Sequence, residues 1–519
     1  MSVATPHPEY QRALYTWEAL EAAYEGSGAI KGAVDQRASA YAPGGVKMAG
    51  TRYLPRPAGM RLESQYAQYR DRASWYAATE RAVHGFTGAI FRKEPTLAVP
   101  ARLEEQLRDV TQTGMPWQTF AEQSVLHTLL LGRYGVLVDF PAPEGPPEGR
   151  SAPPAVSRPY WVGYRAQEIL NWRTERRQGD TVLTLVVLRE WQHEVQGPWG
   201  TDDFFVIAQR PQYRVLRLDE NQHYEVSVWR QGPRGTGGQP VLFQDLAQTV
   251  VPLRSGRPLA YIPFTFLSAF TLEPHVQKSL MEALVEINFR YYRHSADYEH
   301  ARFSLLPSPI ICSDKVDMET ELLLGPSVVV MIPDSNAKFG MLAGDPAMMT
   351  SMQEGLETDK RDMAMLGARL LEAAPEVQET ATANRNRLSG AESPIQTLIG
   401  TVSQGLTQVL QTHAWWAGLT EDDTDPAIQF QLNKDIVASD MSPQLLQQLV
   451  QAFLQNAISF ETLYYNLQQG EIARPGVDFE EEQALIELAK EQTMVAVAPV
   501  PGTPGTPPPR ANGATRVAG

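Results

Sequence analysis

The first 135 residues carry the hydrophobic spacing of helices. Over residues 62–91 (LESQYAQYRDRASWYAATERAVHGFTGAIF), apolar and aromatic side chains recur mostly every three or four positions, with charged residues between them. That period predicts one amphipathic helix with an aromatic face, which ends before Pro95. A second helix is predicted over residues 117–131, and the run at residues 136–140 (VLVDF) indicates a buried strand.

Short runs of β-branched and aromatic residues replace this pattern between residues 160 and 266. A loop precedes them, because residues 141–159 (PAPEGPPEGRSAPPAVSRP) hold too much proline and glycine for a regular element. Turn sequences such as Gly197-Pro198 separate strand-like runs such as residues 182–188 (VLTLVVL). We therefore expect a mostly antiparallel β region here.

Two long helices are predicted in the middle of the chain. Residues 278–303 and residues 346–370 each place apolar side chains at steps of three and four, as on one seam of a long helix. Between these helices, residues 309–312 (PIIC) and 328–332 (VVVMI) are strand-like. The local pattern is helix, small β module, helix.

The rest of the chain returns mostly to helix. Residues 372–379 (EAAPEVQE) interrupt the second long helix. A helical period resumes over residues 380–416, where Pro394 predicts a kink near the start. Shorter helices are expected further on, and residues 499–519 have the composition of a disordered tail.

Length, charge and cysteine content narrow the classes of protein. A chain of 519 residues is long for one compact core, so two or more domains or an elongated subunit are favoured. The net charge of −15 argues against tight, static binding of nucleic acid, although not against DNA passing through a mostly repulsive lumen. Cys312 is the only cysteine, which excludes an intrachain disulfide and a zinc site built on paired cysteines. The sequence shows no signal peptide and no apolar run of membrane length, so we expect synthesis in the cytoplasm and no membrane partner.

No motif indicates catalysis or a cofactor, so a non-enzyme without a cofactor or metal is expected. The chain lacks a G-x-x-x-x-G-K-[ST] phosphate loop and a G-x-S-x-G elbow, and the glycines at residues 232–238 fit a hairpin turn. His294 and His300 are six positions apart on a predicted helix and point to different faces, unlike the i, i+4 pair of a zinc helix. The acidic run at residues 421–425 lacks the pattern of a calcium loop, so a solvated turn is the better interpretation.

The order of these elements resembles the portal proteins of tailed bacteriophages, whose subunit runs wing, stem helix, clip, stem helix, tunnel loop, tunnel helix and crown. Local sequence resembles one subgroup of portal proteins in three regions. These are residues 53–55 (YLP), 66–73 (YAQYRDRA) and 87–95 (TGAIFRKEP) near the start, 288–300 (NFRYYRHSADYEH) with 306–309 (LPSP), and 379–384 (ETATAN) with 415–418 (WWAG). The resemblance covers residues 45–420, and the order of the motifs carries it rather than any single one.

The resemblance implies an α+β, mainly helical portal fold. Its parts are an α/β wing, antiparallel stem helices, a small β-containing clip, a kinked tunnel helix and a helical C-terminal crown. Carried onto this sequence, the wing spans residues 1–276, the first stem helix 277–304, the clip 305–345 and the second stem helix 346–371. The tunnel loop then spans 372–384, the tunnel helix and its return to the wing 385–440, the crown 441–495 and a disordered tail 496–519.

The resemblance also implies a function in the virion. Portal subunits form a ring of twelve at one capsid vertex, assembled in the host bacterial cytoplasm, through which DNA is packaged and ejected. The implied partners are double-stranded DNA, the terminase large subunit, the head-tail adaptor, and the major capsid and scaffolding proteins. Glu376 and Glu379 would face the channel and repel phosphates, and Arg385 and Arg387 would make brief phosphate contacts.

Two other interpretations stay open at this point. The chain is a different virion structural or adaptor protein without a DNA channel, or it is an enzyme, such as a hydrolase that uses the His294 region. A ring with an opening as wide as duplex DNA would distinguish a portal protein from the structural or adaptor protein. Retained assembly with lost turnover in a His294→Ala variant would support the enzyme.

Overall fold

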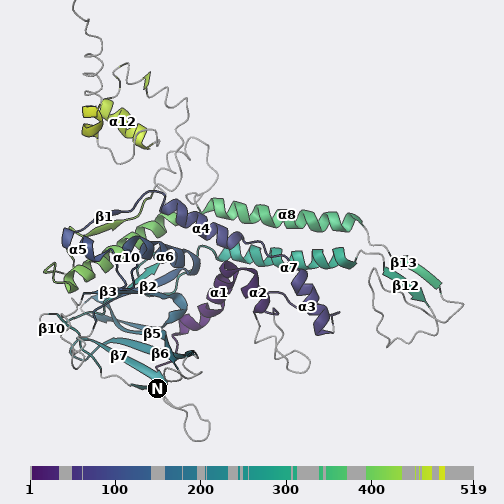
Figure 1. Ribbon diagram of the computed structural model, residues 1–519, viewed down its shortest axis with the longest axis horizontal. Coiled ribbons are helices and arrows are strands. Elements are labelled where there is room, and N and C mark those ends of the chain that lie inside the picture. Colours follow the sequence, from purple (N-terminus) through teal and green to yellow (C-terminus); the bar gives the residue numbers. More distant parts are fainter. Residues whose placement is uncertain are drawn as a thin grey trace, which may run out of the picture. The chain divides into compact units, whose positions relative to one another are not determined.

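The protein's structure is a computed structural model, in which the chain forms two compact units, Met1–Ile436 and Val437–Gly519. The structure describes residues 3–33, 50–60, 62–141, 158–177, 179–195, 205, 207–231, 243–245, 249–254, 256–304, 308–312, 338–342, 346–370, 393–422, 424–434, 450–451, 455, 457, 459–469 and 479–485. The first unit combines helices with antiparallel sheets, which confirms the expected α+β class (Figure 1).

The N-terminal part of the first unit is helical, as predicted. Its helices are α1 (Pro8–Glu25), α2 (Ser27–Gly32), α3 (Glu63–Arg72), α4 (Ala78–Ile90), α5 (Ala101–Gln106) and α6 (Trp117–Leu131). The single helix predicted over residues 62–91 is wrong, because residues 73–77 leave the helical conformation between α3 and α4. The backbone N–H groups of Ser74 and Thr79 donate to the side chains of Ser295 and Asn288, which lie more than 200 residues further along the chain, and these hydrogen bonds hold the break.

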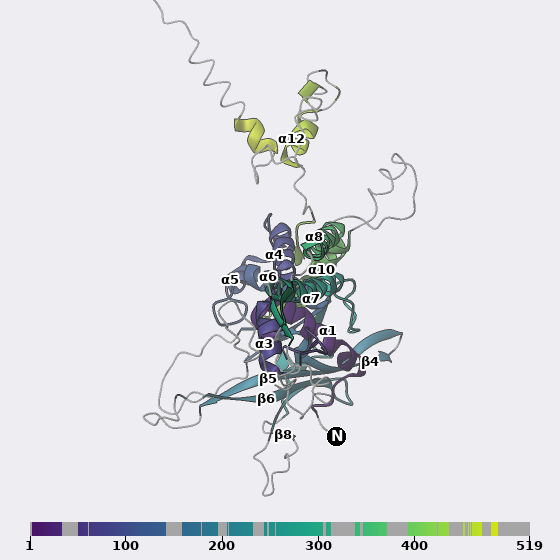
Figure 2. The ribbon, with the colours of Figure 1, turned by 90° about the vertical axis from the view of Figure 1, so that its right-hand side faces the viewer.

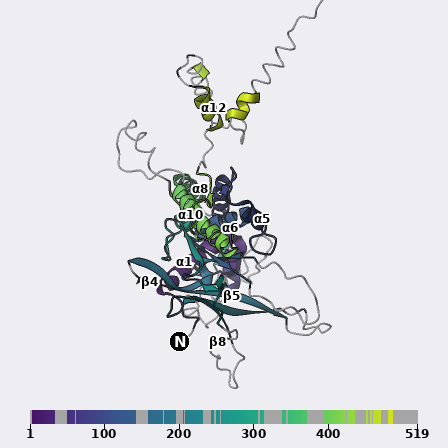
Figure 3. The same cartoon turned by 90° about the vertical axis from the view of Figure 1, so that its left-hand side faces the viewer.

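The predicted β region folds into two antiparallel sheets with short additions. One sheet has the order β11-β2-β3, formed by Phe264–Ser268, Arg133–Asp139 and Tyr160–Arg165. The other has the order β4-β5-β6-β7-β8, formed by Ile169–Arg177, Asp180–Val195, Ile207–Leu218, Tyr224–Gln231 and Phe243–Asp245. A 3-10 turn, η2 (Ala166–Glu168), joins the sheets, and β9 (Leu253–Arg254) pairs with β10 (Arg257–Pro258). Figures 2 and 3 show the five-stranded sheet on one side of this unit and α6 and α10 on the other.

A partly buried charge network joins the two sheets. Arg214 of β6 donates to Asp139 of β2 at 3.0 Å and to Glu190 of β5 at 2.8 Å. Tyr160 donates to Asp139 at 2.9 Å, and Tyr164 donates to Glu190 at 2.7 Å. Burial alone would raise the pKa of Glu190, but Arg214 and the hydrogen bonds from Tyr164 and Gln212 hold it below its ordinary value. The sheets are therefore cross-linked by charge as well as by apolar packing.

The helix α10 (Pro394–Trp416) returns the chain to the N-terminal core. Ser393 caps it and Pro394 occupies its first turn, so this proline begins a helix. The kink that the sequence predicts near the start of this helical segment would lie before Pro394, on residues outside the described part of the chain. A Cβ on Gly405 would clash with the buried Leu267 side chain of β11, so glycine allows α10 to approach the sheet closely without displacing it. The strand β14 (Gln429–Gln431) follows and pairs with β1 (Thr96–Ala98).

Two long helices flank a β-hairpin in the middle of the chain, as predicted. The helices are α7 (Glu282–Ser304) and α8 (Pro346–Arg369), and the hairpin consists of β12 (Ser308–Cys312) and β13 (Lys338–Leu342). The strand that pairs with β12 is therefore residues 338–342, whereas the run predicted at 328–332 lies outside the described residues.

The second unit, Val437–Gly519, contains α12 (Phe460–Gln469). Leu463 and Tyr464 are buried, and the Tyr464 ring lies 6.2 Å from the Phe479 ring. This local cluster is consistent with the short helices expected near the C-terminus.

Candidate functional site: the α7–α8 hairpin

The helices α7 and α8 pack side by side through a small apolar seam (Figure 1). Tyr291 of α7 is buried against Leu356 and Met363 of α8. Ile287 and Tyr298 extend this cluster along α7, so its members there follow at steps of four and seven residues, on one side of the helix. The seam is separate from the main hydrophobic core, which means that the hairpin has a local core of its own.

Ion pairs fix the register of the two helices. Asp359 of α8, with a side chain only 3% exposed, accepts from Arg290 at 2.7 Å and pairs with the His294 imidazole at 2.7 Å. Arg290 also reaches Asp362 at 2.6 Å. Arg290, which precedes His294 on α7, reaches beyond the shared Asp359 to Asp362, so the two helices run antiparallel. A slip of either helix by one turn would leave the buried Asp359 without its partners.

The opposite side of α7 is anchored to the N-terminal helices through aromatic contacts and a buried amide. The Phe289 ring stacks on Tyr53 at 4.5 Å. Asn288, fully buried, accepts from the backbone N–H and the hydroxyl of Thr79 at 3.3 and 2.9 Å, and donates to the Tyr76 carbonyl at 2.8 Å. This amide replaces helical hydrogen bonds that the chain lacks where it breaks between α3 and α4.

Two further contacts hold the same break. Ser295 accepts from the Ser74 N–H at 3.1 Å, and Tyr69 donates to Asp297 at 2.6 Å. Burial and the neighbouring Asp297 carboxylate both raise the pKa of Tyr69. In contrast, α8 leaves the side away from α7 exposed, with Met365 54% accessible. The hairpin is thus fixed at α7 and presents α8 outward.

Replacing Asn288 with alanine is expected to lower the free energy of unfolding by about 1–2 kcal/mol, because the buried Thr79 and Tyr76 groups lose their partner. Faster amide hydrogen exchange over residues 74–79 should accompany the loss. The control is Glu286→Ala on the exposed side of α7, which should change stability by less than about 0.5 kcal/mol. Unchanged exchange over residues 74–79 in the Asn288→Ala variant would contradict the anchoring role.

The β12–β13 hairpin is inserted between the C-terminal end of α7 and the N-terminal end of α8. Within the described part of the chain, it is a sheet of two strands only. An isolated two-stranded hairpin is marginally stable in water, so pairing with further strands would stabilise it.

The predicted channel residues Glu376, Glu379, Arg385 and Arg387 lie outside the described residues. Their place in the sequence is between Arg369, where α8 ends, and Ser393, which caps α10. Their role stays a prediction.

The acidic and histidine positions considered for a metal site are not brought together. His294 pairs with Asp359, Asp297 accepts from Tyr69, Glu299 pairs with Arg302, and the His300 ring meets the edge of the Tyr69 ring. No group of three or more metal-ligating side chains occurs among the described residues. In the acidic run, Asp425 accepts from the Ala427 N–H, as in a local turn.

The His294–Asp359 pair matches two members of a hydrolytic triad in geometry, since a carboxylate orients the imidazole. A nucleophile is the missing member: of the described side chains, no serine, threonine or cysteine hydrogen-bonds to His294. The carboxylate also binds Arg290, so its contacts serve the packing of the two helices.

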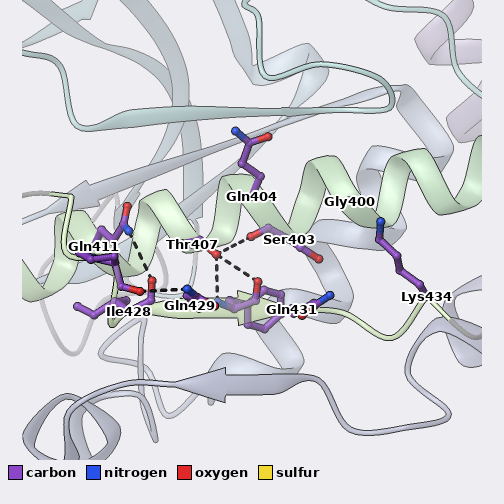
Figure 4. Close-up of a pocket in the computed structure, with 11 residues that line it drawn as sticks. Gly400, Ser403, Gln404, Thr407, Gln411, Ile428, Gln429, Gln431 and Lys434 are labelled. Atoms are coloured by element: carbon purple, nitrogen blue, oxygen red, sulfur yellow. Dashed lines mark hydrogen bonds between the residues drawn. The ribbon is translucent and has the colours of Figure 1, made fainter.

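A groove of about 440 Å³ lies between α10 and β14 (Figure 4). Its polar groups hold the strand in place. Phe430 N–H donates to the Thr407 hydroxyl at 3.0 Å, and Leu432 N–H donates to Ser403 at 3.0 Å. Lys434 is the one ionisable side chain in its lining, so the groove offers no pair of groups for acid–base chemistry.

No helix among the described residues combines the length and apolar character needed to span a bilayer. The sequence model of a domain of unknown function, DUF4055, matches residues 280–417, which include the α7–α8 hairpin and α10 but make up less than half of the chain. No curated protein matches the chain. Among solved structures, the chain is similar to chains from the neck of a native GTA particle computed with C12 symmetry and the neck of an empty GTA particle computed with C6 symmetry. The identities are 13% and 14%, both TM-scores are 0.34, and the matches cover 80% of this chain and 95% and 96% of the others. Similarity at this TM-score supports no conclusion about the function of the chain.

Proposed function

We propose that this protein is a phage portal subunit, which forms a ring at one capsid vertex and surrounds a channel for DNA. The observation that carries the proposal is the α7–α8 hairpin. Its helices are antiparallel, have a seam and ion pairs of their own, and are anchored through one side of α7 to a larger α+β body. Identical copies of such a hairpin, placed side by side, can wall a cylinder.

The uncovered side of α8 is the surface available to a neighbouring copy. It exposes Met365 together with charged residues such as Glu354 and Arg361. Isolated exposed methionines are common on surfaces, but an apolar side chain flanked by charged residues on an outward helix side suits a helix–helix contact with polar margins. The β12–β13 hairpin would extend the ring at the end where α7 finishes and α8 begins. Strands of neighbouring copies would there form hydrogen bonds with its unpaired backbone edges.

The net charge of the chain suits a channel through which DNA slides better than a surface that binds DNA tightly. A net charge of −15 disfavours strong phosphate binding, and low friction matters more than affinity when DNA must slide. In this proposal Glu376 and Glu379 face the channel and repel DNA, while Arg385 and Arg387 make brief phosphate contacts. The role needs no catalytic residue, cofactor or metal.

The proposal extends to oligomeric state and partners through the portal resemblance. Twelve subunits would form the ring in the virion, the β-hairpin region would dock the terminase large subunit and later the head-tail adaptor, and the body would meet the major capsid and scaffolding proteins. A virion structural or adaptor protein without a DNA channel is the alternative function, because the same hairpin can mediate other assemblies.

Negative-stain imaging of the purified full-length protein tests the proposal. We expect rings with a central opening wide enough for duplex DNA to pass. Class averages along the ring axis give the subunit number. Closed particles, linear assemblies or monomers at high protein concentration would favour the alternative.

A further inference from the structure

Two charged residues lie on the side of α7 that faces neither α8 nor the N-terminal helices. Glu286 and Arg293 are both exposed, whereas Tyr291 packs against α8 and Phe289 stacks on Tyr53. They are seven positions apart, so they lie on one side of the helix, about 10.5 Å apart along its axis. In the described structure the Glu286 carboxylate has no ion-pair or hydrogen-bond partner. The Arg293 Nε donates to the Tyr53 carbonyl at 3.1 Å, which holds this guanidinium at the surface.

The outward side of α8 carries the same pair of charges at the same spacing. Glu354 and Arg361 are exposed and also seven positions apart, again with the acidic residue first. Each precedes a residue of the apolar seam, Leu356 or Met363, by two positions, which places it about 200° away, on the opposite side of the helix. Among the described residues neither charged side chain has an ion-pair or hydrogen-bond partner.

These two pairs of charges are complementary when the helices that carry them run antiparallel. Arg361 of one helix then faces Glu286 of the other, and the remaining acid faces the remaining base at the same time. Parallel helices would instead place acid against acid and base against base. Because α7 and α8 are antiparallel within one copy, α8 of one copy and α7 of the next are antiparallel in any ring of hairpins that point the same way.

The heights of the charges along the hairpin agree with such a contact. Its ion pairs place Asp359 level with residues 290–294 of α7, so Arg361 is level with residues 288–292. Copies related by rotation about one axis are not shifted along it, so a neighbouring α7 lies at the same height. Glu286 is then two to six positions from the level of Arg361, about 3–9 Å along the helix. The second pair has the same offset, because both spacings are seven positions, so one tilt of the hairpin against the ring axis closes both pairs.

The same register gives the exposed Met365 an apolar neighbour. Met365 follows Arg361 by four positions and lies on the same side of α8, 54% exposed. On α7, the exposed Ala283 precedes Glu286 by three positions, so it lies opposite Met365 when the charges are paired. A second copy of the chain therefore meets both the charges and the apolar side chain of this side of α8.

We propose that the outward side of α8 docks on the exposed side of α7 in a second copy of this chain. Arg361 pairs with Glu286 of the partner subunit. Glu354 pairs with Arg293 of the partner subunit. This contact rests on the proposed function, which supplies the ring, and it identifies the surface of the neighbour that α8 meets.

Sedimentation velocity of the full-length protein over a range of concentrations tests this contact. Arg361→Glu and Glu286→Arg should each raise the concentration of half-assembly by about tenfold or more, because like charges then meet at every subunit contact. An equimolar mixture of the two variants should assemble within about threefold of the wild-type concentration, because alternating copies pair opposite charges around an even-numbered ring. The Arg361→Glu/Glu286→Arg double variant should assemble equally well.

Further variants separate the contact from net charge and from folding. Glu105→Arg makes the same change of charge at an exposed position of α5 and should leave the half-assembly concentration unchanged. Because Glu286 has no partner within its own chain, its substitution should not change the denaturant unfolding of the unassembled subunit. Mixing Glu354→Arg with Arg293→Glu should give the same rescue through the second pair.

The outcomes distinguish this contact from the ring itself. Wild-type rings that survive both single reversals would overturn the contact and leave the ring standing. Reversals that disrupt assembly but are rescued neither by the mixtures nor by the double variant would also overturn it. Wild-type protein that stays monomeric would overturn the proposed function, and this contact with it.

Discussion

Replacing Met363 with aspartate is expected to detach α8 from α7 and to abolish ring formation, while the rest of the first unit stays folded. Met363 is 3% exposed and packs against Tyr291 in the seam. A carboxylate there would be buried without a partner and would lie close to the carboxylates of Asp359 and Asp362. Burying an uncompensated charge costs about 3–5 kcal/mol, which exceeds what one small cluster can offset.

Met365 provides a matched control for this prediction. It lies two residues further along the same helix but is 54% exposed, so Met365→Asp adds the same charge to solvent. Hydrogen exchange over residues 346–369 should rise strongly in Met363→Asp and change little in Met365→Asp. If Met363→Asp kept both the protection of α8 and the rings seen by negative stain, the seam would not be the basis of the assembly.

The α7–α8 helices and the β element between them could be predicted from the sequence, because the hydrophobic spacing that specifies each of them is local. Apolar side chains at steps of three and four specify two long helices, and the strand-like run beginning at Pro309 specifies a β element between them. The register of the helices has no such signal. Arg290 and Asp359 are 69 residues apart in the chain, so periodicity within either helix does not indicate that they meet. The one clue to the register was that α7 carries the basic side chains Arg290 and His294 and α8 carries the acidic side chains Asp359 and Asp362.

The break between α3 and α4 shows why local periodicity also misleads. The aromatic pattern from Tyr66 to Phe86 fits one helix, but Asn288 and Ser295 bond to the backbone at Thr79 and Ser74 and stabilise a non-helical link. Their partners lie more than 200 residues away, so tertiary contacts override local propensity. The charge network around Arg214 was missed for the same reason, since it joins three strands that are far apart in sequence.

Lowering the pH from 7 to 4.5 is expected to destabilise the first unit by about 2–3 kcal/mol through His413 alone. This histidine is 0% exposed and joins α10 to the body: Trp161 donates to its Nδ1 at 3.0 Å, and its Nε2 lies 3.0 Å from the Gln106 side-chain oxygen. The neutral ring with a proton on Nε2 satisfies both contacts. Burial, with a contribution from Arg158, lowers the pKa of His413 to about 3.

The sign follows from proton uptake in the two states. The unfolded chain binds a proton at His413 below its ordinary pKa of about 6.5, whereas the folded chain stays neutral until about pH 3. Stability is therefore full above pH 6.5 and falls by about 1.4 kcal/mol per pH unit below it. Burial also lowers the pKa of His127, to about 4, which adds to the loss in the same direction.

Denaturant unfolding at several pH values between 7 and 4.5, compared for the wild type and His413→Gln, isolates this contribution. The glutamine variant should be less stable at pH 7, because it loses the Trp161 contact, but its stability should fall less steeply toward acid. His84→Gln, a replacement of an exposed histidine on α4, should retain the wild-type slope. Equal slopes for wild type and His413→Gln would mean that His413 takes up its proton over the same pH range in the folded and the unfolded protein, which would contradict the stability role assigned to its neutral ring.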